Sequence, residues 1–157
     1  MNKETNSSTE RGENDRALRT AMNILAYAEC TEKTLRQKLQ DKGYSAESAE
    51  FAVDYMLKHR YLDEKRYLYR MVEYLGNTKL YGRRRIAVQV KQKGFSAQTL
   101  SEHLEAALAR IDERENCRRA LEKVKKSDPK KTVDALVRRG FLYGDIKAAM
   151  SEMHNQE

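Results

Sequence analysis

The sequence contains few of the residues that interrupt helices. Proline occurs once, at Pro129, and glycine occurs seven times in 157 residues. β-Sheets need many turns, and turns are rich in proline and glycine. This scarcity predicts an all-α chain.

Export signals, paired cysteines and long apolar runs are also missing. The polar N-terminus lacks the apolar core of a signal peptide. No apolar run approaches the length of a membrane span. Cys30 and Cys117 lie far apart and belong to no CxxC pattern. We therefore expect free thiols, a cytoplasmic location and no membrane contact.

Nothing in the sequence has the pattern of a catalytic or metal site. His59, His103 and His154 share no ligand spacing with each other or with the two cysteines. There is no phosphate-binding loop, and no nucleophile, base and orienting group converge. The sequence therefore predicts no enzyme activity, no metal and no cofactor.

The chain is basic. Its 31 Lys and Arg against 24 Asp and Glu give a net charge of +7. Such a charge favours a nucleic-acid partner, or a partner already loaded with nucleic acid. Simple solubility is the alternative explanation.

One helix ending occurs three times. Each copy has an aliphatic residue, a basic residue three positions later, then glycine and an aromatic residue. The copies are Leu39-x-x-Lys42-Gly43-Tyr44, Val90-x-x-Lys93-Gly94-Phe95 and Leu136-x-x-Arg139-Gly140-Phe141. Glycine closes a helix by adopting positive φ without a Cβ penalty. We expect this conformation at Gly43, Gly94 and Gly140.

Cap residues mark the expected helix starts. Thr31, Ser45 and Asp63 can each cap a helix, and Asp128-Pro129 is a strong start signal. Between Ile111 and Lys126 there is no breaker, so the chain either continues as one long helix or bends near Asp112. Gly76-Asn77 is expected to end one helix, and Gly82 to open the next turn. In the first helix, the residues at helical apolar spacing are Leu18, Met22, Leu25 and Ala26.

These signals predict three tandem three-helix units. Residues 1–14 have almost nothing to bury and are expected to form a disordered polar tail. The repeats are expected at residues 15–62, 63–111 and 112–154. A unit of about 45 residues cannot bury enough surface alone. We therefore expect the repeats to stack in an elongated, curved array of helix-turn-helix-like units.

Five motifs resemble those of the RecX family, the bacterial regulators that act on the RecA recombinase. They are Thr31-x-x-x-Leu35-x-x-x-Leu39, Tyr61-Leu62-Asp63-Glu64, Gly82-x-x-Arg85-Ile86, Lys93-Gly94-Phe95 and Arg139-Gly140-Phe141. The resemblance runs from Asp15 to Met153. Thr34 and Gln89 depart from it, since both stand where the family usually has an acidic residue.

The resemblance implies a non-catalytic protein that lodges in the groove of the RecA–DNA filament. It would thereby regulate recombination, ATP hydrolysis and the co-protease activity of RecA in the SOS response. We also expect a monomer with weak direct binding to DNA. A stand-alone DNA- or RNA-binding helical repeat protein is the alternative.

The expected contact surface lies on the second helix of the middle repeat. From Lys79 to Lys93 there is no acidic residue, and the basic residues are Lys79, Arg83, Arg84, Arg85, Lys91 and Lys93. A helical wheel places Arg84, Val88 and Lys91 on one stripe, opposite Ile86 and Val90. A solvated basic face is the alternative for the charges, and an isolated exposed side chain is the alternative for Val88.

Further contact candidates lie outside this helix. Tyr69 is expected on the charged face of its own helix, and Tyr81 in an exposed turn beside Gly82. Either ring could stack on bases. Arg138 and Arg139 close a second, more dilute basic cluster whose other members are Arg118, Arg119, Lys123, Lys125, Lys126, Lys130 and Lys131. Some members of that cluster are expected only to keep their helix soluble.

Overall fold

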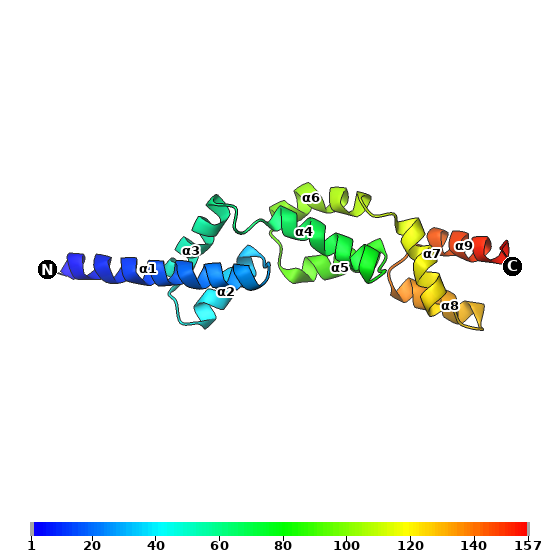
Figure 1. Ribbon diagram of the computed structural model, residues 1–157, viewed down its shortest axis with the longest axis horizontal. Helices are drawn as coiled ribbons and strands as arrows, with labels where there is room; N and C mark the ends of the chain where they lie inside the picture. Colours follow the sequence, from blue (N-terminus) through cyan, green and yellow to red (C-terminus); the bar gives the residue numbers. More distant parts are fainter. Residues whose placement is uncertain (1, 157) are drawn as a thin grey trace. The chain divides into compact units, whose positions relative to one another are not determined.

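The structure, a computed structural model, describes residues 2–156 (Figure 1). Within that range it contains nine α-helices, one π-helical turn and no strand, so the all-α prediction is confirmed. The elements are α1 (Asn2–Tyr27), α2 (Glu32–Asp41), α3 (Ala46–Lys58), α4 (Glu64–Glu73), η1 (Tyr74–Thr78), α5 (Arg83–Lys93), α6 (Ala97–Ala109), α7 (Glu113–Val124), α8 (Pro129–Arg138) and α9 (Tyr143–His154).

The chain divides into two compact units. Unit 1 comprises Met1–Tyr67 and Gly94–Ala97, and unit 2 comprises Leu68–Lys93 and Gln98–Glu157. This division falls inside α4 and at the start of α6. The predicted ranges 63–111 and 112–154 each contain three α-helices, and the range 15–62 contains α2, α3 and the second half of α1. Their boundaries do not coincide with those of the compact units, so the three repeats stay a prediction.

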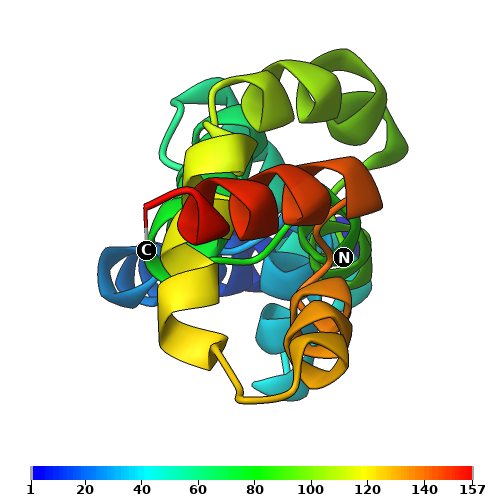
Figure 2. The same ribbon diagram turned by 90° about the vertical axis from the view of Figure 1, so that its right-hand side faces the viewer.

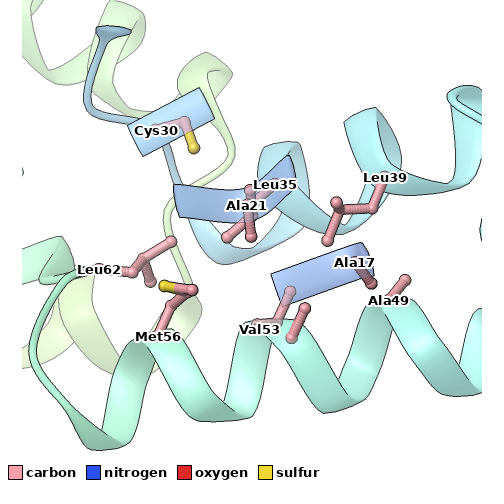
Figure 3. Packing of buried hydrophobic residues seen from close by; sticks show 10 residues of the cluster. Ala17, Ala21, Cys30, Leu35, Leu39, Ala49, Val53, Met56 and Leu62 are labelled. Carbon is pink, nitrogen blue, oxygen red and sulfur yellow. The ribbon is translucent and has the colours of Figure 1, made fainter. Parts of the chain in front are cut away.

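The core of unit 1 is built from small and aliphatic side chains of three helices. α2 contributes Leu35 and Leu39, α3 contributes Val53 and Met56, and α1 contributes alanines (Figure 3). The buried set is Ala17, Ala21, Cys30, Leu35, Leu39, Ala49, Ala52, Val53, Met56 and Leu62. Because alanine side chains are short, α1 approaches α2 and α3 closely.

The buried face of α1 differs from the predicted one. Ala17 and Ala21 are fully buried, whereas Met22 is exposed and Leu18 and Leu25 lie at the edge of the core. The larger apolar residues therefore flank the contact surface of α1, and the alanines occupy its centre.

The structure describes residues 2–14, for which the sequence predicts a disordered polar tail, as the first part of helix α1. α1 begins at Asn2 and contains no proline that would stop it. Glu13 Oε1 accepts a hydrogen bond of 2.8 Å from the Ser45 amide, and Asn14 Oδ1 accepts one of 2.8 Å from Ser48 Oγ. The end of the expected tail is thus tied to the start of α3 by polar contacts, which an apolar pattern does not reveal.

The three glycine endings have the expected conformation. Gly43, Gly94 and Gly140 have φ angles of 96°, 100° and 92°. These values confirm the predicted positive φ at the end of the second helix of each repeat.

The predicted caps are confirmed as well. The side chains of Thr31, Ser45, Asp63 and Asp128 each accept a hydrogen bond from a backbone amide in the first turn of the following helix. Asp112 caps α7 in the same way, accepting from the Glu115 amide. The chain therefore turns near Asp112, and one long helix through this region is ruled out.

Gly76-Asn77 does not end the helix that begins as α4. The helix widens instead into η1, where the Lys79 amide donates to the Tyr74 carbonyl at 3.0 Å. Gly76 is buried here, and a Cβ on it would lie 2.7 Å from Ile111 Cδ1. Gly76 thus allows the Ile111 side chain to pack directly against the backbone of η1, and it does not end the helix.

In unit 2, helices α7, α8 and α9 pack together around an apolar core (Figure 2). Leu80, just beyond η1, is part of this core and is 1% exposed. The backbone φ of Leu80 is 56°, a conformation that residues other than glycine rarely adopt. Burial of Leu80 among Leu121, Leu136 and Phe141 offsets the strain.

Glu64, at the start of α4, accepts hydrogen bonds from two backbone amides, one at the start of α2 and one just before α6. Glu64 Oε2 accepts from the Glu32 amide at the start of α2, and Oε1 accepts from the Ser96 amide just before α6, both at 2.9 Å. Glu113 in α7 likewise accepts from the Arg83 amide at the start of α5, at 2.9 Å. Glu64 and Glu113 thus bring helix starts together within each unit.

Candidate functional site

The net positive charge of the chain lies entirely in its C-terminal part, residues 68–157. Residues 1–67 carry 12 Lys and Arg and 12 Asp and Glu, so they are neutral overall. Residues 68–157 carry 19 Lys and Arg and 12 Asp and Glu, and this difference accounts for the whole net charge of +7. A site for a polyanion is therefore to be sought in unit 2.

Helix α5 presents an exposed stripe of Arg84, Val88 and Lys91, here called the α5 stripe. Val88 is 53% exposed, while Ile86 and Val90 on the opposite side are buried. The side chains of Arg84 and Lys91 form no ion pair among the residues that the structure describes. An anionic partner would therefore meet two free cations on either side of an apolar side chain.

The other arginines at the start of α5 are already engaged. Arg83 forms an ion pair of 3.2 Å with Glu105 of α6. The guanidinium of Arg85 lies 3.9 Å from the centre of the Tyr81 ring, and both residues are half-buried. Tyr81 was expected in an exposed turn, but its ring is covered by Arg85 because the two residues pack as a cation–π pair. Of the three consecutive arginines, only Arg84 is unpaired.

A backbone junction places the end of α8 beside the start of α5. The Gly82 amide donates to the Arg139 carbonyl at 2.7 Å, and the Arg84 amide donates to the Gly140 carbonyl at 3.3 Å. Gly82 was expected only to open a turn, but it is where the backbone before α5 comes closest to the backbone at the end of α8. The two basic segments that are separate in the sequence meet at this junction.

Arg139 serves the fold at this junction. Its Nη1 donates to the carbonyls of Lys79 and Leu80 at 2.9 and 3.3 Å. These bonds fix the backbone on either side of the strained Leu80. Arg138 is exposed beside it, and exposed Lys79 lies 5.8 Å from the Tyr74 ring centre. Arg138 and Lys79 can therefore contribute to a basic surface next to Arg84, whereas Arg139 is occupied.

Tyr69 lies between two side chains of unit 2. Its ring centre is 4.1 Å from the Arg110 guanidinium and 6.4 Å from the His103 ring centre. The prediction placed Tyr69 on the charged face of α4, free to stack on bases. The ring is half-buried instead, because α6 and the turn after it supply partners that the sequence of α4 does not show.

The second basic cluster is partly neutralised. Arg118 pairs with Glu115 and Glu122 at 2.7 and 2.9 Å. The hydrogen bond from Arg118 holds the pKa of the Glu115 carboxyl below its usual value. Arg119 donates to the Asn77 carbonyl. Lys130 and Lys131 of this cluster are exposed, as is Lys93 at the end of α5. Members of this cluster thus act mainly within the fold or as solvated charge.

The buried thiol of Cys117 is poorly suited to act as a nucleophile. Burial raises the pKa of the Cys117 thiol to about 12, and the nearby Asp145 and Glu113 raise it further. A thiol with such a pKa is almost entirely protonated near neutrality and is a poor nucleophile. Among the described residues, no three potential ligands converge on a point that could hold a metal ion. No described helix combines the length and the apolar character that crossing a membrane requires.

Three comparisons with known proteins agree. Residues 17–56 match the family model described as "RecX, first three-helix domain". The chain is 31% identical over 137 residues to "Regulatory protein RecX" of Clostridium botulinum strain Alaska E43, covering 81% of this chain and 63% of that protein. It is 30% identical to the protein of the same name from Vibrio vulnificus, covering 85% of this chain and 90% of that protein. The chain thus spans less than two thirds of the clostridial relative and most of the other.

Solved structures support the same fold. A crystal structure of RecX from Lactobacillus salivarius superposes with a TM-score of 0.77, at 19% identity and covering 92% of this chain and 98% of that one. A second crystal structure, of a regulatory protein RecX, gives a TM-score of 0.81 at 18% identity, covering 96% of this chain and 78% of that one. At such identities the likeness establishes the helical repeat fold alone.

Proposed function

Since this chain belongs to the RecX family, we propose that it is a non-catalytic regulator that binds in the groove of the RecA–DNA filament. The α5 stripe is the single observation that carries this proposal. It offers two unpaired cations and an exposed apolar side chain on one helix face. A nucleoprotein filament presents both phosphate charge and protein surface, and the stripe is suited to both.

The mode of action follows from occupancy of the groove. A protein bound there would limit addition of RecA subunits, and with it strand exchange, ATP hydrolysis and co-protease activity. Arg84 and Lys91 would meet negative charge, while Val88 would pack against an apolar part of the filament. Lys79 and Arg138 would extend the basic surface beyond α5.

Stand-alone binding to DNA or RNA is the second candidate. The concentration of all the net charge in residues 68–157 favours it. Binding through several phosphates alone would weaken steeply between low and physiological salt, because it depends on counterion release. A filament-groove binder with protein contacts should be retained on filaments at salt concentrations that release it from bare DNA.

Co-sedimentation distinguishes the two candidates. The full chain is mixed with RecA filaments formed on single-stranded DNA, and in parallel with the same DNA alone, at matched salt. The proposal predicts retention on filaments at physiological salt and loss from naked DNA. Equal retention on both would favour the nucleic-acid binder and contradict the proposal.

A further inference from the structure

A groove in unit 1 has no role in the site described above. It lies between α1 and the end of α2 and has a volume of about 720 Å³. Its lining residues are Thr20, Asn23, Ile24, Tyr27, Lys38, Lys42 and Tyr44. All of them belong to unit 1.

The floor of the groove is fixed by a pair of hydroxyl groups. Thr20 Oγ1 and Tyr44 Oη lie 2.8 Å apart, and Tyr44 Oη also donates to the Arg16 carbonyl. Ile24 provides an apolar surface and packs against the core. The floor is therefore preformed, which reduces the entropy lost on binding.

One wall of the groove presents an unusually exposed aromatic residue. Tyr27 at the end of α1 is 94% exposed and has almost no contact with the rest of the chain. Tyrosine is frequent at the energetic centres of protein interfaces, because its ring buries a large area with little loss of rotamer entropy. Asn23, one turn before it, offers amide donors and an acceptor for a peptide backbone.

The other wall is cationic. Lys38 in the last turn of α2 and Lys42, the C-cap of that helix, are four residues apart and both line the groove, and no carboxylate is among the lining residues. The neighbouring Asp41 accepts a hydrogen bond of 2.8 Å from Gln37 and points to that partner. The residues that line the groove thus carry two positive charges together with hydroxyl, amide and aromatic groups, and none of them carries a negative charge.

We propose that this groove binds an acidic peptide segment of a partner protein. Two carboxylates of the peptide pair with Lys38 and Lys42, and an aliphatic or aromatic side chain between them packs on Ile24 and the Tyr27 ring. Nucleic acid fits less well, because residues 1–67 have no net charge and polyanion binding requires several phosphate contacts. The proposal is independent of what the α5 stripe binds.

The test uses fluorescently labelled peptides of about ten residues in which Glu and Asp surround one Leu, Phe or Tyr. Binding to the full chain is measured by fluorescence anisotropy up to about 1 mM protein, the limit of weak specific affinity. The wild type is compared with K38E/K42E and with Tyr27→Ala. The matched control is K58E/K65E, since Lys58 and Lys65 are exposed in unit 1 and outside the groove.

We expect saturable binding that K38E/K42E weakens at least about tenfold, that Tyr27→Ala weakens at least about threefold, and that K58E/K65E leaves within about twofold. Thermal melts show whether each variant is folded, and Tyr27→Ala removes too little packing to unfold the chain. Failure of every peptide to bind, or equal losses in K38E/K42E and K58E/K65E, would overturn the proposal. It would also be overturned if K38E/K42E released a labelled single-stranded oligonucleotide while leaving peptide binding intact.

Discussion

Gly82 and Gly140 lie with their backbones in direct contact. The Gly82 amide donates to the carbonyl of Arg139 at 2.7 Å, and a Cβ on Gly82 would overlap the carbonyl group of Gly140. A Cβ on Gly140 would in turn overlap the backbone of Arg85. The pair therefore fixes where the start of α5 meets the end of α8, and with it the position of Arg84 relative to Arg138.

Replacing Gly82 by alanine should destabilise unit 2. The added methyl group has no room, because backbone atoms block it and cannot move as a side chain can. We expect a loss of about 3 kcal/mol in the free energy of unfolding, measured by urea denaturation. Gly144→Ala is the control, since nothing lies within 4 Å of a Cβ there. A loss of similar size in both variants would show that the contact between Gly82 and Gly140 is unimportant.

Replacing Gly94 by valine should destabilise the chain for a different reason. Its φ of 100° is strained for any residue with a side chain, and most for a β-branched one. We expect a cost of about 2 kcal/mol, observed as a lower Tm. Gly94→Asn should cost less, because asparagine tolerates positive φ better. An unchanged Tm in the valine variant would contradict the assigned helix ending.

Glu64→Gln should be destabilising despite its similar shape. Glu64 is 5% exposed, and its two oxygens accept from two backbone amides. An amide side chain can replace only one acceptor and turns a donor toward the other amide. Leaving that buried group unsatisfied should cost about 2 kcal/mol, measured by thermal denaturation. Lys65→Ala, at the exposed neighbouring position, should change stability by less than about 0.5 kcal/mol.

Glu32 should make stability depend on pH. Burial and the nearby Glu64 raise the pKa of Glu32 above 4.5. The folded state therefore binds a proton more readily than the unfolded state, and ionised Glu32 disfavours folding above its folded pKa. Glu32→Gln should thus be more stable than the wild type near pH 7, by no more than about 0.5 kcal/mol because solvent screens the charge. The advantage should disappear below pH 4.5, and a gain that persists there would contradict this explanation.

The helix endings could be predicted from the sequence because their causes are local. Positive φ at Gly43, Gly94 and Gly140 requires only glycine after a helical segment. The caps at Asp128 and Thr31 depend on amides within three residues. The exposure of Val88 followed from the helical period alone. Each of these features is determined by residues close in the chain.

The roles of the basic and aromatic residues depended on partners far away in the chain. Arg139 reaches the carbonyl of Lys79, which is 60 residues away, and the Tyr69 ring packs against the guanidinium of Arg110, just beyond the end of α6. A helical wheel gives the direction of a side chain but not what lies opposite it. For the same reason the polar contacts of Glu13 with α3 were missed. The exposure of the α5 stripe, by contrast, could be predicted because it depends only on the helical period and on no distant residue.

Charge reversal within the α5 stripe tests whether this surface binds the RecA filament. The double variant R84E/K91E is compared with K130E/K131E, which makes the same change in charge at exposed positions of α8. Neither pair lies in a core, so both variants should melt close to the wild type. Binding to RecA filaments on single-stranded DNA is then measured at physiological salt. We predict that R84E/K91E loses at least about tenfold in affinity, or ~1.4 kcal/mol, and that K130E/K131E loses far less. Equal losses in the two variants, or no loss in R84E/K91E, would contradict this prediction.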